Sequence, residues 1–423
     1  MRRHRARFLA LTAVTAVSAA AVAACGGGTS TTSTADVSGN AITVGISEPL
    51  TGAFAADGQA SKQGYQLWAS DINASGGLLG HRVKLIILND NSLQNTTAKQ
   101  YSTLITTDHV NFTLGPFSSL LTEAAGPATA HYGYALPEGS GTAPAVFGMN
   151  DHDLFGVSTP DASEMVPFAN WVTSLTGTAR PKTAAYPMEN DPFADPPVLA
   201  TEKTLEAAGI STVYTNKADP ITANSTDSNL VPIAKAVAAA HPDVVVLGSV
   251  DVPTVLDFVK AFEAANYTPK IFIAASGPDQ GLAFEDQVGP AAATGVMVPD
   301  GWSGGIADAL SHVMVQDYIA KFGGTTAGIN ADVAEAYSSG EVLADAVTAT
   351  KSLDNAKIIA YLHSGVTLQT VQGSAKFDSV GENVGAPAFI FQWQNGQFDQ
   401  VLPATAQGST RILAVKPPFN TSG

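Results

Sequence analysis

ITVGISEPLTGAFAADGQASKQGYQLWASDINASGGLLGHRVKLIILND, residues 42–90, has the pattern of a strand, a helix and a second strand in that order. Residues 42–47 and 83–88 are short apolar runs, as expected for strands. The helix is predicted at 58–74, where the following small and apolar residues share one face: Ala60, Gly64, Leu67, Trp68 and Ile72. Gly76-Gly77 supplies its stop signal. The stretch therefore predicts a βαβ unit, the building block of a parallel sheet.

The same alternation continues along the chain. Helices are expected at 96–107, 119–131, 197–208, 229–240 and 253–265, and strands at 112–114, 183–186, 244–247 and 271–274. Residues 244–247 read VVVL, apolar without alternation, which is typical of a strand buried on both faces. We therefore expect an α/β protein with two parallel sheets. In open sheets of this kind, ligands bind beyond the carboxyl ends of the strands.

Composition and charge limit the classes of function. The chain has 423 residues, of which 45% are hydrophobic and 14% charged, and these values favour well-buried globular domains over disorder. Its length favours two domains. The formal net charge is −16, and removal of residues 1–24, which carry four arginines and no acids, would leave −20. Nucleic acid and anionic lipid headgroups are therefore not expected partners, because like charges repel.

The N-terminus has the plan of a secretory signal peptide. Four arginines precede an apolar run at 8–24. That run is rich in alanine and shorter than the roughly 20 strongly apolar residues that span a bilayer. The next residue, Cys25, is the only cysteine in the chain, so no disulfide can form within it. Residues 25–40, rich in Gly, Ser and Thr, cannot pack around this thiol and are expected to form a flexible tether.

Residues 22–25, VAAC, resemble the lipobox of bacterial lipoproteins. The resemblance implies that the Cys25 thiol receives a diacylglycerol and that cleavage makes this cysteine the new N-terminus. Two or more acyl chains hold a protein stably at a membrane, whereas one chain holds it only marginally. We therefore expect an extracytoplasmic protein that is anchored by lipid to the cell membrane.

Residues 42–90 as a whole resemble the opening of the leucine/isoleucine/valine-binding family of solute receptors for ABC importers. The resemblance continues less closely through GPFSS at 115–119, GSGTAPAVF at 139–147 and FIFQW at 389–393. It implies a type I periplasmic-binding fold, in which two doubly wound parallel-sheet lobes are joined by three crossovers and enclose the ligand. The crossovers are expected near 158–161, 298–302 and 376–385. The first lobe would contain 41–159 and 300–378, and the second lobe 160–299 and 379–423.

The same resemblance implies a function without catalysis. We expect a monomeric receptor that delivers a branched-chain or related amino acid to an ABC permease and needs no cofactor or metal. A non-amino carboxylate or a short amide is the alternative ligand, and a ligand sensor would share the same fold. An exported hydrolase is disfavoured, since the chain has no Gly-x-Ser-x-Gly elbow and no His-Glu-x-x-His sequence. Asp151-His152-Asp153 has no further clustered ligands and indicates a hydrated turn rather than a metal site.

Four hydroxyl residues are candidates for binding a carboxylate. Ser118 and Ser119 end a strand and open a helix, where free N–H groups and the helix dipole favour an anion, although helix capping also explains a serine there. Ser140 and Thr142 lie in a Gly-rich loop, and turn formation is the alternative role for these two. Family members hold the carboxylate of an amino acid at the corresponding positions.

Four further residues are candidates for the ammonium side. Family members use a Tyr and an acidic residue of the second lobe, and here Phe193, in NDPFAD, stands where that Tyr would fall. A phenyl ring can still contact a cation. Asp251 and Asp279 follow strands and therefore belong to the correct sheet edge, although a loop aspartate is often simply solvated. Asp57 occupies a loop position where family members place a bulky ligand-contacting side chain, and a helix cap is its alternative role.

Overall fold

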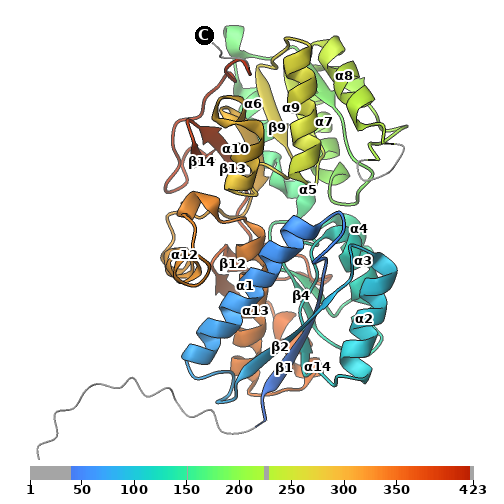
Figure 1. Ribbon diagram of the computed structural model, residues 1–423, viewed down its shortest axis with the longest axis vertical. Helices are drawn as coiled ribbons and strands as arrows, with labels where there is room; N and C mark the ends of the chain where they lie inside the picture. The colour runs from blue at the N-terminus through green and yellow to red at the C-terminus, as the bar shows by residue number, and fades with distance from the viewer. Residues whose placement is uncertain (1–39, 150, 223–227, 420–423) are drawn as a thin grey trace, which may run out of the picture. The chain divides into compact units, whose positions relative to one another are not determined.

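The computed structural model describes residues 40–149, 151–222 and 228–419. The predicted signal peptide, the Cys25 anchor and all of the tether except Asn40 lie outside the described residues. Figure 1 shows the order of the helices and strands along the chain. The predicted βαβ opening is confirmed as β1 (Ile42–Glu48), α1 (Ala55–Ala74) and β2 (Val83–Asn89).

The first lobe is built on a parallel sheet with β1 at its centre. β1 pairs with β2 on one side and with β3 (Phe112–Thr113) on the other. β4 (Leu136–Glu138) pairs in parallel with β5 (Leu154–Gly156). The Gly115 amide donates a 2.9 Å hydrogen bond to the Pro137 carbonyl, which connects the end of β3 to β4. A separate antiparallel hairpin consists of β11 (Leu368–Thr370) and β12 (Gly373–Ala375).

Seven helices accompany these strands. They are α1, α2 (Gln94–Thr106), α3 (Ser119–Ala130), α4 (Pro144–Phe147), α12 (Ala309–Phe322), α13 (Asp332–Thr350) and α14 (Asn355–Leu362). A 3₁₀ turn (Thr326–Gly328) lies between α12 and α13. α1 and α13 lie side by side, although more than 250 residues separate them in the sequence (Figure 1).

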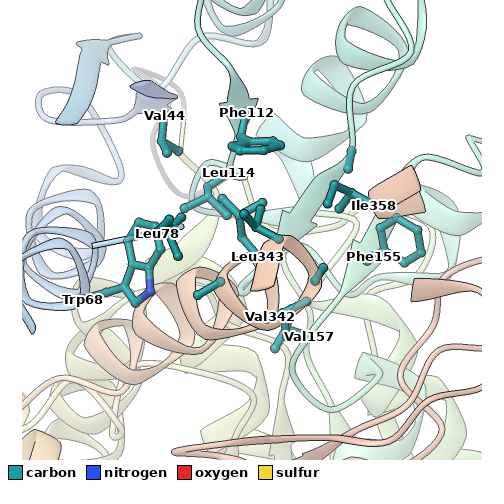
Figure 2. Packing of buried hydrophobic residues seen from close by; sticks show 14 of the residues in the cluster. Val44, Trp68, Leu78, Phe112, Leu114, Phe155, Val157, Val342, Leu343 and Ile358 are labelled. Atoms are coloured by element: carbon teal, nitrogen blue, oxygen red, sulfur yellow. The ribbon is translucent and has the colours of Figure 1, made fainter. Parts of the chain in front are cut away.

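Glycine allows this close approach of α1 and α13. A Cβ atom on Gly64 of α1 would stand 2.2 Å from the Val333 carbonyl oxygen, and one on Gly340 of α13 would stand 2.3 Å from the Trp68 ring. Figure 2 shows the core around this contact, with Trp68 beside α13 and Leu343 facing the strands. Each large apolar side chain buried in such a core contributes about 1.5–3 kcal/mol.

The second lobe is built on a seven-stranded sheet of order β14-β13-β10-β9-β8-β6-β7. The parallel strands are β6 (Thr183–Tyr186), β7 (Ser211–Thr215), β8 (Val244–Leu247), β9 (Ile271–Ala274) and β10 (Val296–Asp300). β13 (Phe389–Gln394) runs antiparallel to β10, and β14 (Gln397–Leu402) runs antiparallel to β13. The sheet is therefore mixed at one edge, where a wholly parallel sheet was expected.

Helices accompany this sheet as well. They are α5 (Asp161–Glu164), α6 (Val166–Ser174), α7 (Asp195–Ala207), α8 (Leu230–Ala240), α9 (Val252–Ala264), α10 (Leu282–Val288) and α11 (Pro290–Ala293), with a 3₁₀ turn at Gly177–Ala179. Within β8, Val245 and Leu247 join one hydrophobic cluster while Val244 and Val246 join another. All four are fully buried. The prediction of a strand covered on both faces is thereby confirmed.

The chain passes between the two sheets three times. It leaves the first after β5, returns after β10 and leaves again after β12. The three-crossover arrangement is that of the type I periplasmic-binding fold. The domain boundaries given above stay predictions. Just after the predicted boundary between residues 378 and 379, Asn383 donates a 2.6 Å hydrogen bond to the Val157 carbonyl, next to β5 of the first lobe.

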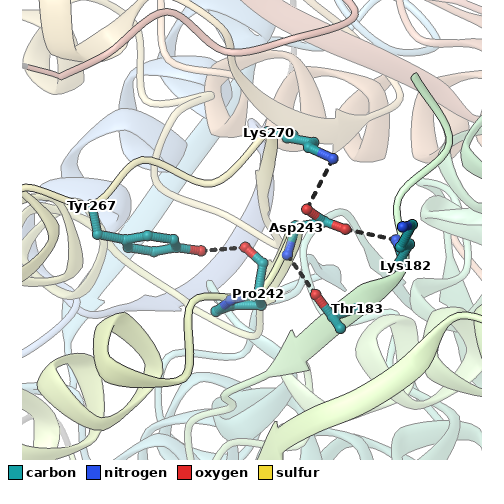
Figure 3. Close-up of polar contacts among 6 residues, drawn as sticks. All are labelled: Lys182, Thr183, Pro242, Asp243, Tyr267 and Lys270. Atoms are coloured by element: carbon teal, nitrogen blue, oxygen red, sulfur yellow. Dashed lines mark hydrogen bonds and ion pairs between the residues drawn. The ribbon is translucent and has the colours of Figure 1, made fainter. Parts of the chain in front are cut away.

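A network of polar contacts fastens the amino ends of the second-lobe strands. Asp243, just before β8, accepts hydrogen bonds from the Lys182 amide at 2.7 Å and pairs with the Lys270 ammonium at 3.0 Å (Figure 3). Its own amide donates to Thr183, and Tyr267 donates to the neighbouring Pro242 carbonyl. Although partial burial acts to raise the pKa of Asp243, these bonds outweigh it and lower that pKa. This end of the sheet therefore carries an acid with its own cation.

Candidate functional site

One polar cavity lies beside the carboxyl ends of strands from both lobes. The first lobe contributes Phe117, Ser118, Ser140, Asp332 and Glu335 to its lining. The second lobe contributes Glu164, Phe193, Val250, Ala275, Ser276, Asp279, Pro299 and Asp300. The space open to the centre of a water molecule is about 40 Å³, and one water needs about 10–15 Å³ on that measure. The cavity is therefore large enough to hold several water molecules between the lobes.

Two of the predicted hydroxyl residues face this cavity. Ser118 precedes α3, is only 3% exposed, and its Oγ has no hydrogen-bond partner within the described chain. It stands at the N-cap of α3 without making a capping hydrogen bond, so the structure does not support capping as its role. Ser140, in the loop after β4, donates a 2.6 Å hydrogen bond to Glu335. Ser118 is therefore the hydroxyl left available to a ligand.

Ser119 and Thr142 lie behind the cavity wall rather than in its lining. The Ser119 Oγ accepts a 3.2 Å hydrogen bond from the Ala143 amide. The Thr142 hydroxyl contacts the Thr159 carbonyl at 3.0 Å and the Asp161 carboxylate. Both hydroxyls join neighbouring loops of the site, and a direct ligand contact for either one stays a prediction.

The glycines of these loops permit a close approach to buried acids. A Cβ atom on Gly115 would stand 1.8 Å from Oε2 of Glu138, and one on Gly139 would stand 2.7 Å from the Glu335 backbone. Glu138 is 1% exposed and accepts hydrogen bonds from the Ser140 and Gly141 amides at 2.6 and 2.8 Å. Burial nevertheless raises the pKa of Glu138 to about 8. This carboxyl group therefore shapes the loop that carries Ser140.

Asp279 and Phe193 of the second lobe line the cavity, as expected from their positions after strands β9 and β6. Asp279 accepts a 2.6 Å hydrogen bond from the Gly277 amide and is also within 3.3 Å of the Ser276 hydroxyl. Burial outweighs these hydrogen bonds and raises the pKa of Asp279 to about 6. An acidic group and an aromatic ring thus both line the cavity, and their contact with an ammonium group stays a prediction.

The other two predicted acids stand just outside the lining. Asp251 is the N-cap of α9 and accepts a 3.0 Å hydrogen bond from the Thr254 amide. Asp57 lies in the first turn of α1, is 1% exposed, and is 3.5 Å from the Asn330 amide nitrogen. Burial, followed by the charge of Asp279, raises the pKa of Asp57 to about 8. Their contact with a ligand stays a prediction.

Sequence reasoning missed four acids of the lining: Glu164, Asp300, Asp332 and Glu335. Asp300 ends the apolar strand β10 and could have been found by the rule that identified Asp279. Asp332 and Glu335 are three residues apart on α13 and therefore share one face of that helix. Their distance in sequence from any first-lobe strand concealed their place at the cavity. Glu164 closes the short helix α5 and carried no usable signal.

These acids raise one another's pKa values across the cavity. Burial, followed by the charges of Asp279 and Glu335, holds the pKa of Asp300 well above its usual range. Burial and the charge of Asp57 hold the pKa of Asp332 well above its usual range. Burial and the charge of Asp161 likewise raise the pKa of Glu164. Burial raises the pKa of Glu335 to about 7 despite its hydrogen bond from Ser140. The lobes thus present acidic groups to each other.

No Lys, Arg or His side chain of the described residues lines the cavity. The ion pairs found in the described chain are Lys217–Glu202, Lys260–Asp257 and Lys270–Asp243, all away from it. Within the same residues, no group of three or more His, Cys, Asp or Glu side chains is arranged to hold a metal ion. Nor does any helix of this part reach the length and apolarity that crossing a membrane requires.

Two α/β lobes with a small cavity between them are the arrangement expected from the resemblance to solute-binding proteins. The chain belongs to the periplasmic binding protein family, whose model matches residues 41–397. The predicted fold and the predicted leucine/isoleucine/valine-binding relationship are both confirmed by this match and by the relatives described next.

Relatives of known name cover most of the chain. An amino acid binding protein of Pseudomonas aeruginosa is 23% identical over 379 residues, which is 88% of this chain and 95% of that protein. A Leu/Ile/Val-binding protein homolog of Brucella melitensis is 21% identical over 362 residues, 84% and 92% of the two chains. The relatives are solute-binding proteins rather than enzymes, as expected at the level of the family.

Solved structures with the same fold include receptors for different ligands. A branched-chain amino acid transporter substrate-binding protein of Streptococcus pneumoniae, in complex with isoleucine, has a TM-score of 0.71 at 20% identity and covers 85% of this chain and 98% of its own. An ABC transporter solute-binding protein of R. palustris, in complex with benzoate, has a TM-score of 0.72 at 16% identity, covering 89% and 99%. The fold is therefore compatible with amino acids and with aromatic carboxylates.

Proposed function

We propose that this protein is the extracytoplasmic receptor of an ABC importer, that lipid on Cys25 holds it at the membrane, and that it binds an amino acid between its lobes. The observation that carries the choice of ligand is the pairing of an unpartnered hydroxyl with carboxylates in one cavity. Ser118 stands at the start of α3, and Asp279 of the second lobe lines the same cavity.

The Ser118 side of the cavity suits the carboxylate of the ligand. The first N–H groups of a helix have no partner within the helix, and the helix dipole favours a negative charge there. α3 is 12 residues long, and the free Ser118 hydroxyl adds a donor at its beginning. These groups can bind a carboxylate without any Lys or Arg.

The opposite side suits an ammonium group. Asp279 accepts an N–H donor, and Phe193 provides an aromatic ring that attracts a cation. A branched-chain or related amino acid is the expectation from the sequence, and its apolar side chain would contact Phe117, Val250 and Pro299 of the lining. A non-amino carboxylate, the alternative ligand, would face the acids without a positive charge to offset them.

The test compares three forms of one ligand by thermal shift and calorimetry: leucine, its deaminated acid and its amide. Leucine should stabilise the protein most. Ser118→Ala should weaken the binding of leucine by about 1–3 kcal/mol, because the substitution removes one hydrogen-bond partner from a buried group. Asp279→Asn should abolish the preference for leucine over the deaminated acid. Ser102→Ala on α2 and Asp286→Asn, exposed on α10, serve as matched controls outside the cavity.

Two results would contradict the proposal. Binding of the deaminated acid alone would show that no ammonium site operates. Unchanged leucine binding in Ser118→Ala would remove the carboxylate assignment. The import role has a separate test, since a deletion strain should lose uptake of the bound solute if the receptor serves a permease, and retain uptake if it serves a sensor.

A further inference from the structure

The cavity holds more carboxyl groups than one ammonium can match. Five carboxyl groups line it, namely Glu164, Asp279, Asp300, Asp332 and Glu335. Two of them come from the first lobe and three from the second, so that both lobes contribute carboxyl groups to one cavity. An amino acid with an apolar side chain has one ammonium and one carboxylate, and its net charge of zero would leave this excess in place.

Unpartnered oxygen atoms give a second and independent indication. Asp300 and Asp332 are 6% and 7% exposed, and the Oδ2 atom of each lacks a hydrogen-bond partner in the described protein. Buried polar atoms are normally hydrogen-bonded, and an unpaired buried carboxylate oxygen is costly. The Asp300 Oδ1 atom already accepts the Trp302 amide at 2.9 Å, so its other oxygen is the one available. One oxygen of each carboxyl group therefore lacks a donor, although the Asp332 carboxyl also forms a side-chain hydrogen bond with Asp57.

We propose that the ligand carries a second cationic nitrogen, an ammonium or guanidinium group, which binds between Asp300 of the second lobe and Asp332 of the first. This inference rests on the proposed function, because it places the group in the same cavity. Asp300 ends β10, where the chain leaves the second sheet, and Asp332 begins α13, which packs on α1. A cation held by both would connect rigid elements of opposite lobes.

The chemical class that fits is a basic amino acid. The Ser118 end would take its carboxylate, Asp279 and Phe193 its α-ammonium, and the Asp300–Asp332 pair its side-chain cation. A bare metal ion fits less well, since the described residues contain no cluster with the arrangement of a metal site. Partial protonation of the acids, with a neutral ligand, is the main competing explanation and is separated by the experiment below.

The decisive comparison is between lysine and norleucine, which has a linear apolar side chain and lacks the side-chain amine. Calorimetry on the mature wild-type protein at pH 7.5 and constant ionic strength should give lysine at least roughly a tenfold lower Kd, since close interfacial charge pairs are strongly coupled. Ornithine and arginine test the length and shape of the cation. ε-N-acetyl-lysine, which has length without charge, should bind no better than norleucine.

Variants then locate the second cation. Asp300→Asn and Asp332→Asn should each reduce the preference for lysine over norleucine, while Asp286→Asn should leave it unchanged. If either cavity variant fails to fold, the other variant and the wild-type comparison still decide the matter. Thermal unfolding of each free variant shows whether a loss of binding reflects a loss of folded protein.

The outcomes separate this inference from the proposed function. Norleucine or leucine binding as tightly as lysine would overturn the second cation and leave an amino acid receptor. Binding of 1,5-diaminopentane as tightly as lysine would support two cations and overturn the carboxylate subsite. Binding of the deaminated acids alone would overturn both. Stabilisation of the protein by calcium chloride but by none of the organic cations would overturn the inference. A failure of every cationic probe to stabilise the protein would overturn it as well.

Discussion

Replacing Glu335 by glutamine should make the ligand-free protein more stable, and increasingly so as the pH rises. Glu335 lies in the first turn of α13 and lines the cavity. Removal from solvent raises its pKa from 4.5 to about 7, the Ser140 hydrogen bond opposes this rise, and the charge of Asp279 adds to it. A glutamine oxygen can still accept the 2.6 Å hydrogen bond from Ser140, so the substitution removes the charge and keeps the contact.

The sign follows from proton linkage. Because the folded pKa is the higher one, the stability associated with this group is fully present below about pH 4.5 and is lost as the pH rises through 7. A rise from 4.5 to about 7 corresponds to about 3 kcal/mol. Glu335 is only partly buried and solvent screens its charge, so we expect about 1–3 kcal/mol between pH 5 and pH 8.

Several other acids act on the same group. The acids whose charges interact with that of Glu335 are Glu138, Asp161, Glu164, Asp279, Asp300 and Asp332. They titrate in both proteins, so the background slope of stability with pH remains in the variant. The quantity to compare is therefore the difference between wild type and Glu335→Gln at each pH.

Urea unfolding of the ligand-free proteins from pH 5 to pH 8 measures this difference. The advantage of Glu335→Gln should be small at pH 5 and should grow by about 1–3 kcal/mol at pH 8. Glu206→Gln, which changes an exposed acid on α7, should follow the wild type at every pH. Parallel curves for wild type and Glu335→Gln would refute the reasoning, because the cost of a charge that titrates between these pH values must change with pH.

Three further predictions concern the anchor, the hinge and the core. Cys25→Ser should move the protein from the membrane fraction to the medium, and a variant that stays membrane-bound contradicts the lipoprotein assignment. Ligand at about 100 times its Kd should add roughly 2.7 kcal/mol of stability, and small-angle scattering should show a smaller radius of gyration, because lobe closure around ligand is a known behaviour of periplasmic binding proteins. A radius unchanged by a tight ligand counts against closure. Gly340→Ala should destabilise by about 1–3 kcal/mol in urea, because its Cβ would stand 2.3 Å from the Trp68 ring, and a stabilised variant would contradict this packing.

Much of the fold could be predicted because its signals are local. β8 and β9 were located to the residue, since uninterrupted apolar runs between polar segments leave little choice. The antiparallel β13–β14 hairpin was not predicted, although Asn395-Gly396 between two strand-like runs is a strong hairpin signal. Both residues have positive φ, 51° and 79°, as such a two-residue turn requires. A local rule would thus have corrected the expectation of a wholly parallel sheet.

The site was predictable only where it follows strands. Asp279 and Ser118 could be placed at the cavity because strand ends meet at one edge of a parallel sheet, and their contact with a ligand stays a prediction. Asp332 and Glu335 reach the cavity through packing between α13 and α1, which depends on close contacts such as that of Gly64 with Val333. Nothing in the spacing of residues along the chain reports such a contact. The excess of acids at the cavity therefore became visible only when both lobes were in place.

The packing of α13 against α1 also has a consequence for the order of folding. The core of the first lobe contains Val44 and Trp68 from the start of the chain and Leu343 from near its end. Strands β6 to β10 of the second lobe, by contrast, come from one continuous stretch of the chain. Contacts between residues that are distant in sequence form late, because a long loop must close first. The core of the first lobe therefore closes only after α13 has joined α1, although its first strand comes from the start of the chain.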